Sequence, residues 1–278
     1  MRTSPDLPGA ALLPYLAITF AIPWVLLGVF ILDPWGVTRW LGEPSGSHPL
    51  FIISVWAPAI AALLIVARRG GRAGVRRFLG RLLIWRAPWA WWAFLILGMP
   101  AVFFGGALLR GGVGAVAPPE MGVGELALLA GFMLVLGPVE ELGWRGVALP
   151  ILQRRLSPLA AGLAVGVVWA VWHVPAFLLQ GSMQSGWSYG PFLAGTIAAS
   201  VLMTGFVNAA GGSILVAALF HFQMNNPVWP DARPFDSILL VTAAVGLVLL
   251  TGGKMLRPGE GVTRVIPAST SAEPGETR

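Results

Sequence analysis

Cysteine is absent from this 278-residue chain, and charged residues are scarce. The absence of cysteine excludes disulfide bonds, thiolate metal sites and a cysteine nucleophile. Asp, Glu, Lys and Arg make up 11% of the residues, whereas an ordinary soluble domain has about 25%. Hydrophobic residues make up 56%, and the mean hydropathy is +0.77. This composition leaves too little polar surface for a soluble protein and predicts a polytopic helical membrane protein.

The apolar residues fall in eight blocks, each near or somewhat above the ~20 residues that an α-helix needs to cross a bilayer. We place the blocks at about 9–32, 50–67, 88–109, 123–150, 159–180, 191–209, 212–228 and 236–252. The predicted fold is all-α, with about eight transmembrane helices in a single domain over residues 1–257. Residues 258–278 are rich in Pro, Gly, Ser, Thr and Glu, which predicts a disordered cytoplasmic tail.

Positive charge is unevenly placed along the chain. Seven arginines lie between residues 68 and 86, in a loop between two apolar blocks. Such a run is more typical of a cytoplasmic loop than of a nucleic-acid site, so no nucleic-acid partner is expected. With this loop inside and the helices alternating, the cytoplasmic side holds fourteen Lys and Arg residues and the other side three. The asymmetry predicts that both termini are cytoplasmic, and residues 72–86 predict a basic amphipathic helix on the inner leaflet.

Few strongly polar residues remain inside the apolar blocks. The most notable are Glu140, Glu141 and Arg145 in the fourth block, His173 in the fifth, and His221 and Asn225 in the seventh. An ionisable residue inside a bilayer is costly and is by default a functional-site hypothesis. A lone histidine there is more often a contact between helices. At ~1.5 Å per residue, however, Glu140, His173, His221 and Asn225 lie at similar depths, ~14–21 Å from the predicted cytoplasmic helix ends. Shared depth on three helices favours one site.

Spacing along each helix separates the roles of these side chains. Glu141 and Arg145 are four residues apart and can form an ion pair, which predicts a supporting role for both. Glu140 is rotated by about 100° from Glu141 and is not neutralised by the same arginine. His221 and Asn225 are also four apart and share a face. The spacing therefore leaves Glu140 as the candidate base.

A carboxylate beside an imidazole can activate water as a general base, and a neighbouring His–Asn face can hydrogen-bond a developing oxyanion. This chemistry is hydrolysis of an acyl bond, with Glu140, His173, His221 and Asn225 as the candidate catalytic residues. The chain has neither a GxSxG nor an HExxH sequence, so serine hydrolases and HExxH zinc proteases lack their motifs. A zinc site of Glu140, His173 and His221 is chemically sound, and the residues leave the metal-bound and metal-free versions open.

Three short motifs carry a resemblance to a known family. EExxxR is present as Glu140-Glu141-Leu142-Gly143-Trp144-Arg145, and HxxxN as His221-Phe222-Gln223-Met224-Asn225. The usual FxxxH appears with tryptophan in place of phenylalanine, as Trp169-Ala170-Val171-Trp172-His173. In this order, within about residues 123–230, the motifs resemble the CPBP intramembrane proteases, also called the ABI or CAAX-protease-and-bacteriocin-processing family. That family is related to the type II CAAX prenyl endopeptidases of the Rce1 type.

The resemblance implies an eight-helix intramembrane endopeptidase of the cell membrane, with its site facing the cytoplasmic leaflet. The implied roles are water activation by Glu140 and His173, and an oxyanion hole of His221 and Asn225. The implied substrate is a membrane-associated peptide, in which a prenylated CAAX segment is one candidate. Membrane lipid is the other expected partner. A non-catalytic immunity or scaffold protein of the same fold is the alternative function. A proton-coupled transporter is less favoured because the sequence shows no internal repeat.

Overall fold

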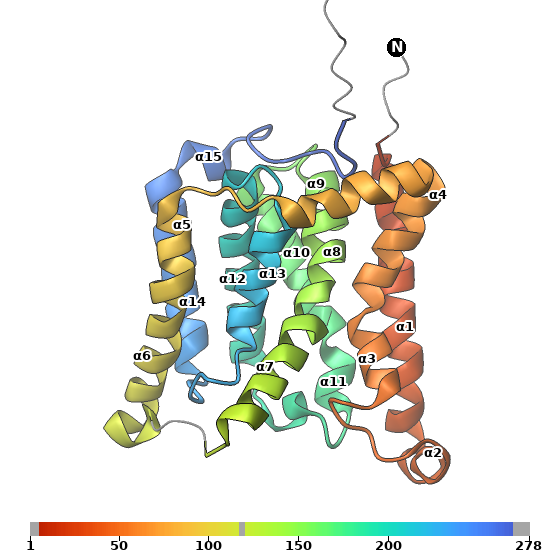
Figure 1. Ribbon diagram of the computed structural model, residues 1–278, viewed down its shortest axis with the longest axis vertical. Helices are drawn as coiled ribbons and strands as arrows, with labels where there is room; N and C mark the ends of the chain where they lie inside the picture. The colour runs from red at the N-terminus through yellow and green to blue at the C-terminus, as the bar shows by residue number, and fades with distance from the viewer. Residues whose placement is uncertain (1–5, 117–119, 269–278) are drawn as a thin grey trace, which may run out of the picture.

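The computed structural model describes residues 6–116 and 120–268, and these residues form a bundle of helices without a β-strand among them (Figure 1). The first half contains η1 (Gly9–Ala11), α1 (Leu12–Leu32), α2 (Pro34–Leu41), α3 (Pro49–Val55), α4 (Ala57–Leu79), η2 (Gly80–Leu83), α5 (Trp89–Ala93), η3 (Phe94–Gly98), α6 (Met99–Gly111), η4 (Gly112–Val116) and α7 (Val123–Leu136). The second half contains η5 (Pro138–Glu140), α8 (Glu141–Gly143), η6 (Trp144–Ala148), α9 (Leu149–Leu152), α10 (Pro158–Trp172), α11 (Val174–Leu178), η7 (Met183–Gly186), α12 (Tyr189–Ala209), α13 (Ile214–Met224), α14 (Phe235–Thr251) and α15 (Gly253–Leu256).

Each predicted apolar block contains helix, but not every helix is long enough to span a membrane. Five described helical stretches meet the length and hydropathy expected of a span: Gly9–Leu32, Trp89–Val116, Val123–Leu152, Pro158–Leu178 and Tyr189–Ala209. The pair Pro49–Val55 and Ala57–Leu83, bent by 56°, adds a sixth if it is counted as one span. Helices α13 and α14 are apolar but shorter. The protein is thus a multi-pass helical membrane protein, whereas the count of eight spans remains a prediction.

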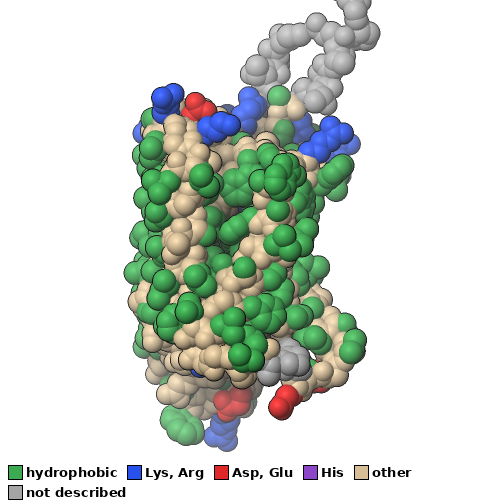
Figure 2. All heavy atoms as spheres, turned by 90° about the vertical axis from the view of Figure 1, so that its left-hand side faces the viewer, with side chains coloured by type: hydrophobic (Ala, Val, Ile, Leu, Met, Phe, Trp, Pro, Cys, Tyr) green, Lys and Arg blue, Asp and Glu red, His purple; other side chains and the backbone are tan. Residues whose placement is uncertain are grey.

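The arginine-rich segment after α3 forms a helix that turns across one end of the bundle (Figure 1). The turn occurs at Gly71, where φ is 56° and ψ is −161°, a conformation that favours glycine because it has no Cβ. We call this end, which also carries α9 and α15, the basic end, because Lys and Arg side chains gather there (Figure 2). The opposite end carries α2, η7 and the loop 225–234, and we call it the open end.

Arg81 departs from the prediction that this segment is a charged surface helix. Its side chain is 2% exposed. Its guanidinium donates hydrogen bonds to four backbone carbonyls: those of Gly146 at 2.7 Å, Gly212 at 2.8 Å, Arg145 at 3.2 Å and Val265 at 3.3 Å. The Gly146 carbonyl lacks its usual helical donor because Pro150, four residues later, has no N–H. Arg81 therefore ties the basic end to the helix that carries Glu140.

The predicted disordered tail is wrong for its first part. Val265 and Ile266 are fully buried, and Val262 donates its backbone N–H to Asn208 Oδ1 at 3.0 Å. Asp6 accepts from the backbone N–H groups of Val265 and Ile266 at 3.1 and 2.9 Å, which joins the two ends of the described chain. The segment has few large apolar residues, which is why its composition predicted disorder. Two buried residues, Val265 and Ile266, are nevertheless enough to anchor it. Residues 269–278 lie outside the described residues.

Candidate active site

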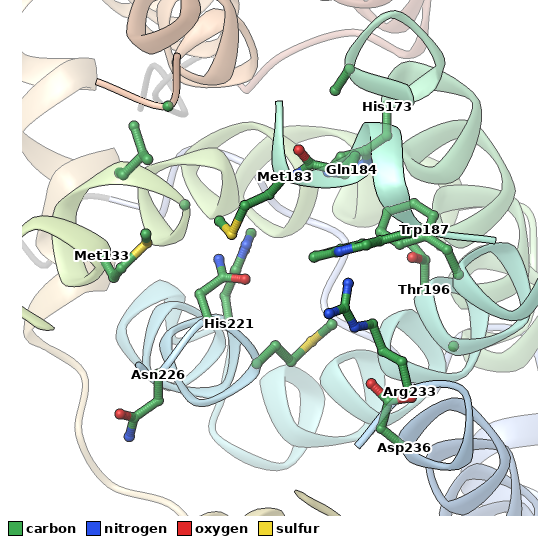
Figure 3. A pocket seen from close by; sticks show the side chains of 18 of the residues that line it. Met133, His173, Met183, Gln184, Trp187, Thr196, His221, Asn226, Arg233 and Asp236 are labelled. Carbon is green, nitrogen blue, oxygen red and sulfur yellow. The ribbon is translucent and has the colours of Figure 1, made fainter. Parts of the chain in front are cut away.

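A cavity of about 800 Å³ lies among the helices, and Glu140, His173, His221 and Asn225 all line it. These four residues come from η5, the junction of α10 and α11, and the end of α13. Apolar side chains of α1, α3, α6 and α7 form much of the remaining wall: Leu27, Phe51, Phe103, Leu129, Phe132 and Met133. Figure 3 shows His173 and His221 on different helices around the cavity. The residues that the sequence placed at one depth therefore share one chamber.

The Glu140 carboxylate is held by two tryptophans. Its Oε2 atom accepts hydrogen bonds from the indole N–H groups of Trp169 at 2.8 Å and Trp144 at 3.2 Å. Trp144 follows Glu140 by one helical turn, whereas Trp169 reaches it from α10. Both indoles are buried, so the donors stay close to the carboxylate without competition from water. The two hydrogen bonds orient Glu140 and leave Oε1 for another partner.

The backbone around Glu140 is irregular. Glu140 ends the 3₁₀ turn η5, and the π-helix η6 begins at Trp144. Pro138 and Pro150 lie within this stretch and each removes a backbone donor. Short π segments within helices occur frequently at functional sites. Here the altered winding brings Glu141, Trp144 and Arg145 into a fully packed region and leaves Glu140 at the wall of the cavity.

Glu141 lies behind the cavity and forms the predicted ion pair with Arg145. Arg145 Nη1 contacts both carboxylate oxygens of Glu141, at 3.1 and 3.0 Å, and neither side chain is exposed. Arg145 also lies over the Trp169 ring, with 4.7 Å between the guanidinium carbon and the ring centroid. His221 Nδ1 is 2.8 Å from Glu141 Oε1. Glu141 is thus shared between a cation and an imidazole from another helix.

The partners of the two histidines define their tautomers. A carboxylate that already binds Arg145 can only accept, so His221 Nδ1 donates to Glu141. His173 Nδ1 lies 2.8 Å from the Trp169 carbonyl and must likewise donate. In a neutral ring, Nε2 is then an acceptor for both residues. His221 can donate from Nε2 only when its ring carries both protons.

Gly137 provides the space between these groups. A Cβ atom added to Gly137 would lie 2.9 Å from His221 Nε2 and closer still to Asn225 Nδ2. Asn225 follows the last residue of α13 and its side chain is exposed to the cavity. Glycine is therefore required here by close approach rather than by backbone conformation.

The candidate site residues lie in a segment that matches a known protein family. Residues 122–226 match the family described as "Type II CAAX prenyl endopeptidase Rce1-like", and all six motif residues fall inside the match. This segment therefore resembles the Rce1-like family. The chain is also 25% identical over 229 residues to the CAAX prenyl protease 2 of Methanococcus maripaludis, covering 74% of this chain and 83% of that protein. Both names are those of peptidases, and they support a membrane peptidase.

The zinc site that the sequence left open stays a prediction. Among residues 6–116 and 120–268, no three His, Cys, Asp or Glu side chains are arranged to hold a metal ion. Glu140, His173 and His221 therefore do not form such a group. One oxygen of Glu140 is already engaged by two N–H donors, and one nitrogen of each histidine is engaged elsewhere. These contacts leave Nε2 of each histidine and Oε1 of Glu140 as the atoms that can bind water or a metal ion.

Two contributors to the site were not predicted from the sequence. The motif shows Trp169 in place of the usual phenylalanine, but the motif alone does not assign the indole N–H to Glu140. The signal was present, because a buried tryptophan needs an acceptor and a buried carboxylate needs donors. Gly137 gave no signal, because its role depends on how α13 packs against η5.

The cavity extends to the open end of the bundle. Gly46, Arg110, Trp187, Asp231 and Arg233 line it there. Arg233 lies over the Trp187 ring at 4.4 Å, and both project into the cavity (Figure 3). Asp231 pairs with Arg110 and also accepts from Arg233 Nε at 2.7 Å. The described chain ends lie at the basic end, away from this part of the cavity (Figure 1).

Proposed function

We propose that this protein is an intramembrane endopeptidase that hydrolyses a peptide bond with water activated by Glu140 and His173. The observation that carries the proposal is the pair of indole hydrogen bonds to Glu140 Oε2 within a cavity that also contains His173, His221 and Asn225. A carboxylate held in one orientation, with one oxygen left for water, is the arrangement that general-base catalysis requires. A purely structural glutamate would not need to line a cavity.

In the proposed reaction, water donates hydrogen bonds to Glu140 and His173 Nε2, and Glu140 takes the proton as the water oxygen bonds to the scissile carbonyl carbon. The oxyanion accepts a hydrogen bond from Asn225 Nδ2, and a second one from His221 Nε2 when that ring carries both protons. Glu140 then passes this proton to the amide nitrogen, and the C–N bond breaks to give an amine and a carboxylic acid, which releases its proton to solvent. Glu141 and Arg145 do not react but position His221 and the helix that carries Glu140.

The proposed substrates are peptides held at the membrane, including prenylated CAAX-type peptides. The apolar wall of α1, α3, α6 and α7 suits a lipid chain or an apolar peptide segment. The name of the archaeal relative points in the same direction. We place the protein in the cell membrane, with lipid as its surroundings.

The test is a cleavage assay on the full chain in lipid nanodiscs. A prenylated CAAX peptide and a set of membrane-anchored peptides are incubated with the wild type, Glu140→Gln and His173→Ala. Glu125→Gln is the matched control, because Glu125 is an exposed carboxylate at the start of the same helical stretch. We expect cleavage by the wild type and the control only. Equal cleavage by wild type and Glu140→Gln would refute the proposal.

Metal dependence is decided by a second measurement on the same preparation. We propose that no metal participates, so dialysis against EDTA and 1,10-phenanthroline should leave the rate unchanged. Loss of activity that zinc restores would show that a metal takes part and that water is activated differently.

A further inference from the structure

The two ends of the bundle differ in charge. Lys and Arg side chains gather at the basic end (Figure 2), which includes the second half of α4 and the segments around α9 and α15. These segments supply twelve of the described basic residues: Arg68, Arg69, Arg72, Arg76, Arg77, Arg81, Arg86, Arg154, Arg155, Lys254, Arg257 and Arg264. The open end has Arg39, Arg110 and Arg233. Of these three, Arg110 and Arg233 contact Asp231, so the open end presents little free positive charge.

The cavity reaches the open end and does not reach the basic end. Its lining includes residues from the loop before α3, from the end of α6, from η7 and from the loop 225–234. The second half of α4, α9 and α15 contribute nothing to it. On the basic side, Glu140 is closed off by packed residues 141–151, all of which are buried. The only described route from an aqueous phase to Glu140 therefore begins at the open end.

We infer that the Glu140 site is reached from the side of the membrane opposite the cytoplasm, and that its substrates present their scissile segment there. The reason is the positive-inside rule, by which short loops rich in Lys and Arg stay in the cytoplasm. That rule places the basic end inside and the mouth of the cavity outside. The inference rests on the proposed peptidase function and narrows its substrates to lipidated or membrane-anchored peptides of the outer leaflet. It replaces the expectation of a cytoplasmic opening.

The natural absence of cysteine makes this orientation directly measurable, because one introduced cysteine is the only thiol in the chain. Gly186→Cys tests the open end, where an added Cβ meets nothing within 4 Å. Ala73→Cys tests the basic end, where Ala73 is exposed. Met133→Cys tests the cavity, which Met133 lines. Leu134→Cys is its matched control, because this neighbouring residue is exposed on the outer surface of α7 and does not line the cavity.

Each variant of the full chain is treated with a charged, membrane-impermeant maleimide in sealed right-side-out vesicles, before and after permeabilisation. We expect Gly186→Cys and Met133→Cys to react fully in sealed vesicles. Ala73→Cys should react only after permeabilisation, and Leu134→Cys should not react in either state because its thiol faces hydrocarbon. Reaction of Ala73→Cys in sealed vesicles, with or without Gly186→Cys, would overturn the inference. Failure of Met133→Cys to react would also overturn it.

A cleavage assay tests separately on which side of the membrane the substrate is cut. The peptide that the nanodisc assay identifies is added outside right-side-out and inverted vesicles that contain the wild type. We expect cleavage in the right-side-out vesicles, and in the inverted ones only after permeabilisation; the opposite pattern would overturn the inference. If no peptide is cleaved in any preparation, the proposed function fails, while the labelling result still decides the orientation.

Discussion

The indole N–H of Trp169 donates a 2.8 Å hydrogen bond to Glu140 Oε2, across the interface between α10 and η5. The Trp169 ring also lies 5.2 Å from the His221 ring and 5.8 Å from the His173 ring, measured between centroids. One side chain therefore contacts the candidate base and packs against both imidazoles. Replacement of the usual phenylalanine by tryptophan thus adds a donor at the centre of the site.

Trp169→Phe should lower kcat by roughly 10- to 100-fold with little change in KM. Loss of a hydrogen bond to a charged group costs about 1.5–3 kcal/mol, and each 1.36 kcal/mol in the barrier is tenfold in rate. Trp172→Phe is the matched control, because Trp172 is also buried beside His173 but donates to the Thr19 carbonyl at 2.9 Å. Steady-state kinetics of both variants provide the comparison. Equal losses would mean that packing, and not the contact with Glu140, explains the effect.

The two adjacent glutamates should respond differently to the same substitution. Glu141→Gln leaves Arg145 buried without a compensating charge, and breaking such a buried pair costs about 3–5 kcal/mol. Glu140→Gln keeps an oxygen that can accept from Trp144 and Trp169, so its effect on the unfolding free energy should stay within about 1 kcal/mol. Thermal unfolding in detergent, measured by circular dichroism, distinguishes the two. A Glu140→Gln variant as unstable as Glu141→Gln would remove the distinction between a reactive and a supporting carboxylate.

Gly137→Ala should abolish most of the activity without unfolding the protein. The added methyl group would occupy the space between His221 Nε2 and Asn225 Nδ2, where water or the substrate carbonyl must lie. Gly131→Ala is the control on the same helical stretch, because a Cβ there meets nothing within 4 Å. That control should remain active and gain about 0.5–1 kcal/mol of helix stability, as for glycine to alanine in a helix interior. An active Gly137→Ala would show that the reaction does not use this space.

The Asp231 carboxylate, at the open end of the cavity, should remain charged well below neutral pH. A hydrogen bond from Arg233 is the main reason that the pKa of Asp231 is lowered from 3.8 to about 2. A carboxyl whose folded pKa is lowered stabilises the fold above its unfolded pKa and loses this contribution as the pH falls through its folded pKa. The difference in melting temperature between wild type and Asp231→Asn should therefore be constant from pH 7 to pH 4 and shrink toward pH 2. Glu120→Gln, an exposed carboxyl, should show no such difference.

Much about this protein follows from the sequence alone. Scarce charge and long apolar blocks determine a helical membrane protein, because lipid offers no partner for unpaired backbone groups. The spacing of Glu140, Glu141 and Arg145 determines which carboxylate pairs with arginine, because helical geometry sets the angle between neighbouring side chains. The shared depth of Glu140, His173 and His221 likewise follows from rise per residue.

Only the tertiary structure decides how these helices are rotated and packed against one another. That packing brings Trp169 to Glu140, places His221 against Glu141, and leaves room for nothing larger than glycine at position 137. It also buries Arg81, which charge counting had assigned to the surface, and opens the cavity away from the basic end. Periodicity along one helix carries no information about these contacts, because each depends on side chains from elements far apart in the chain.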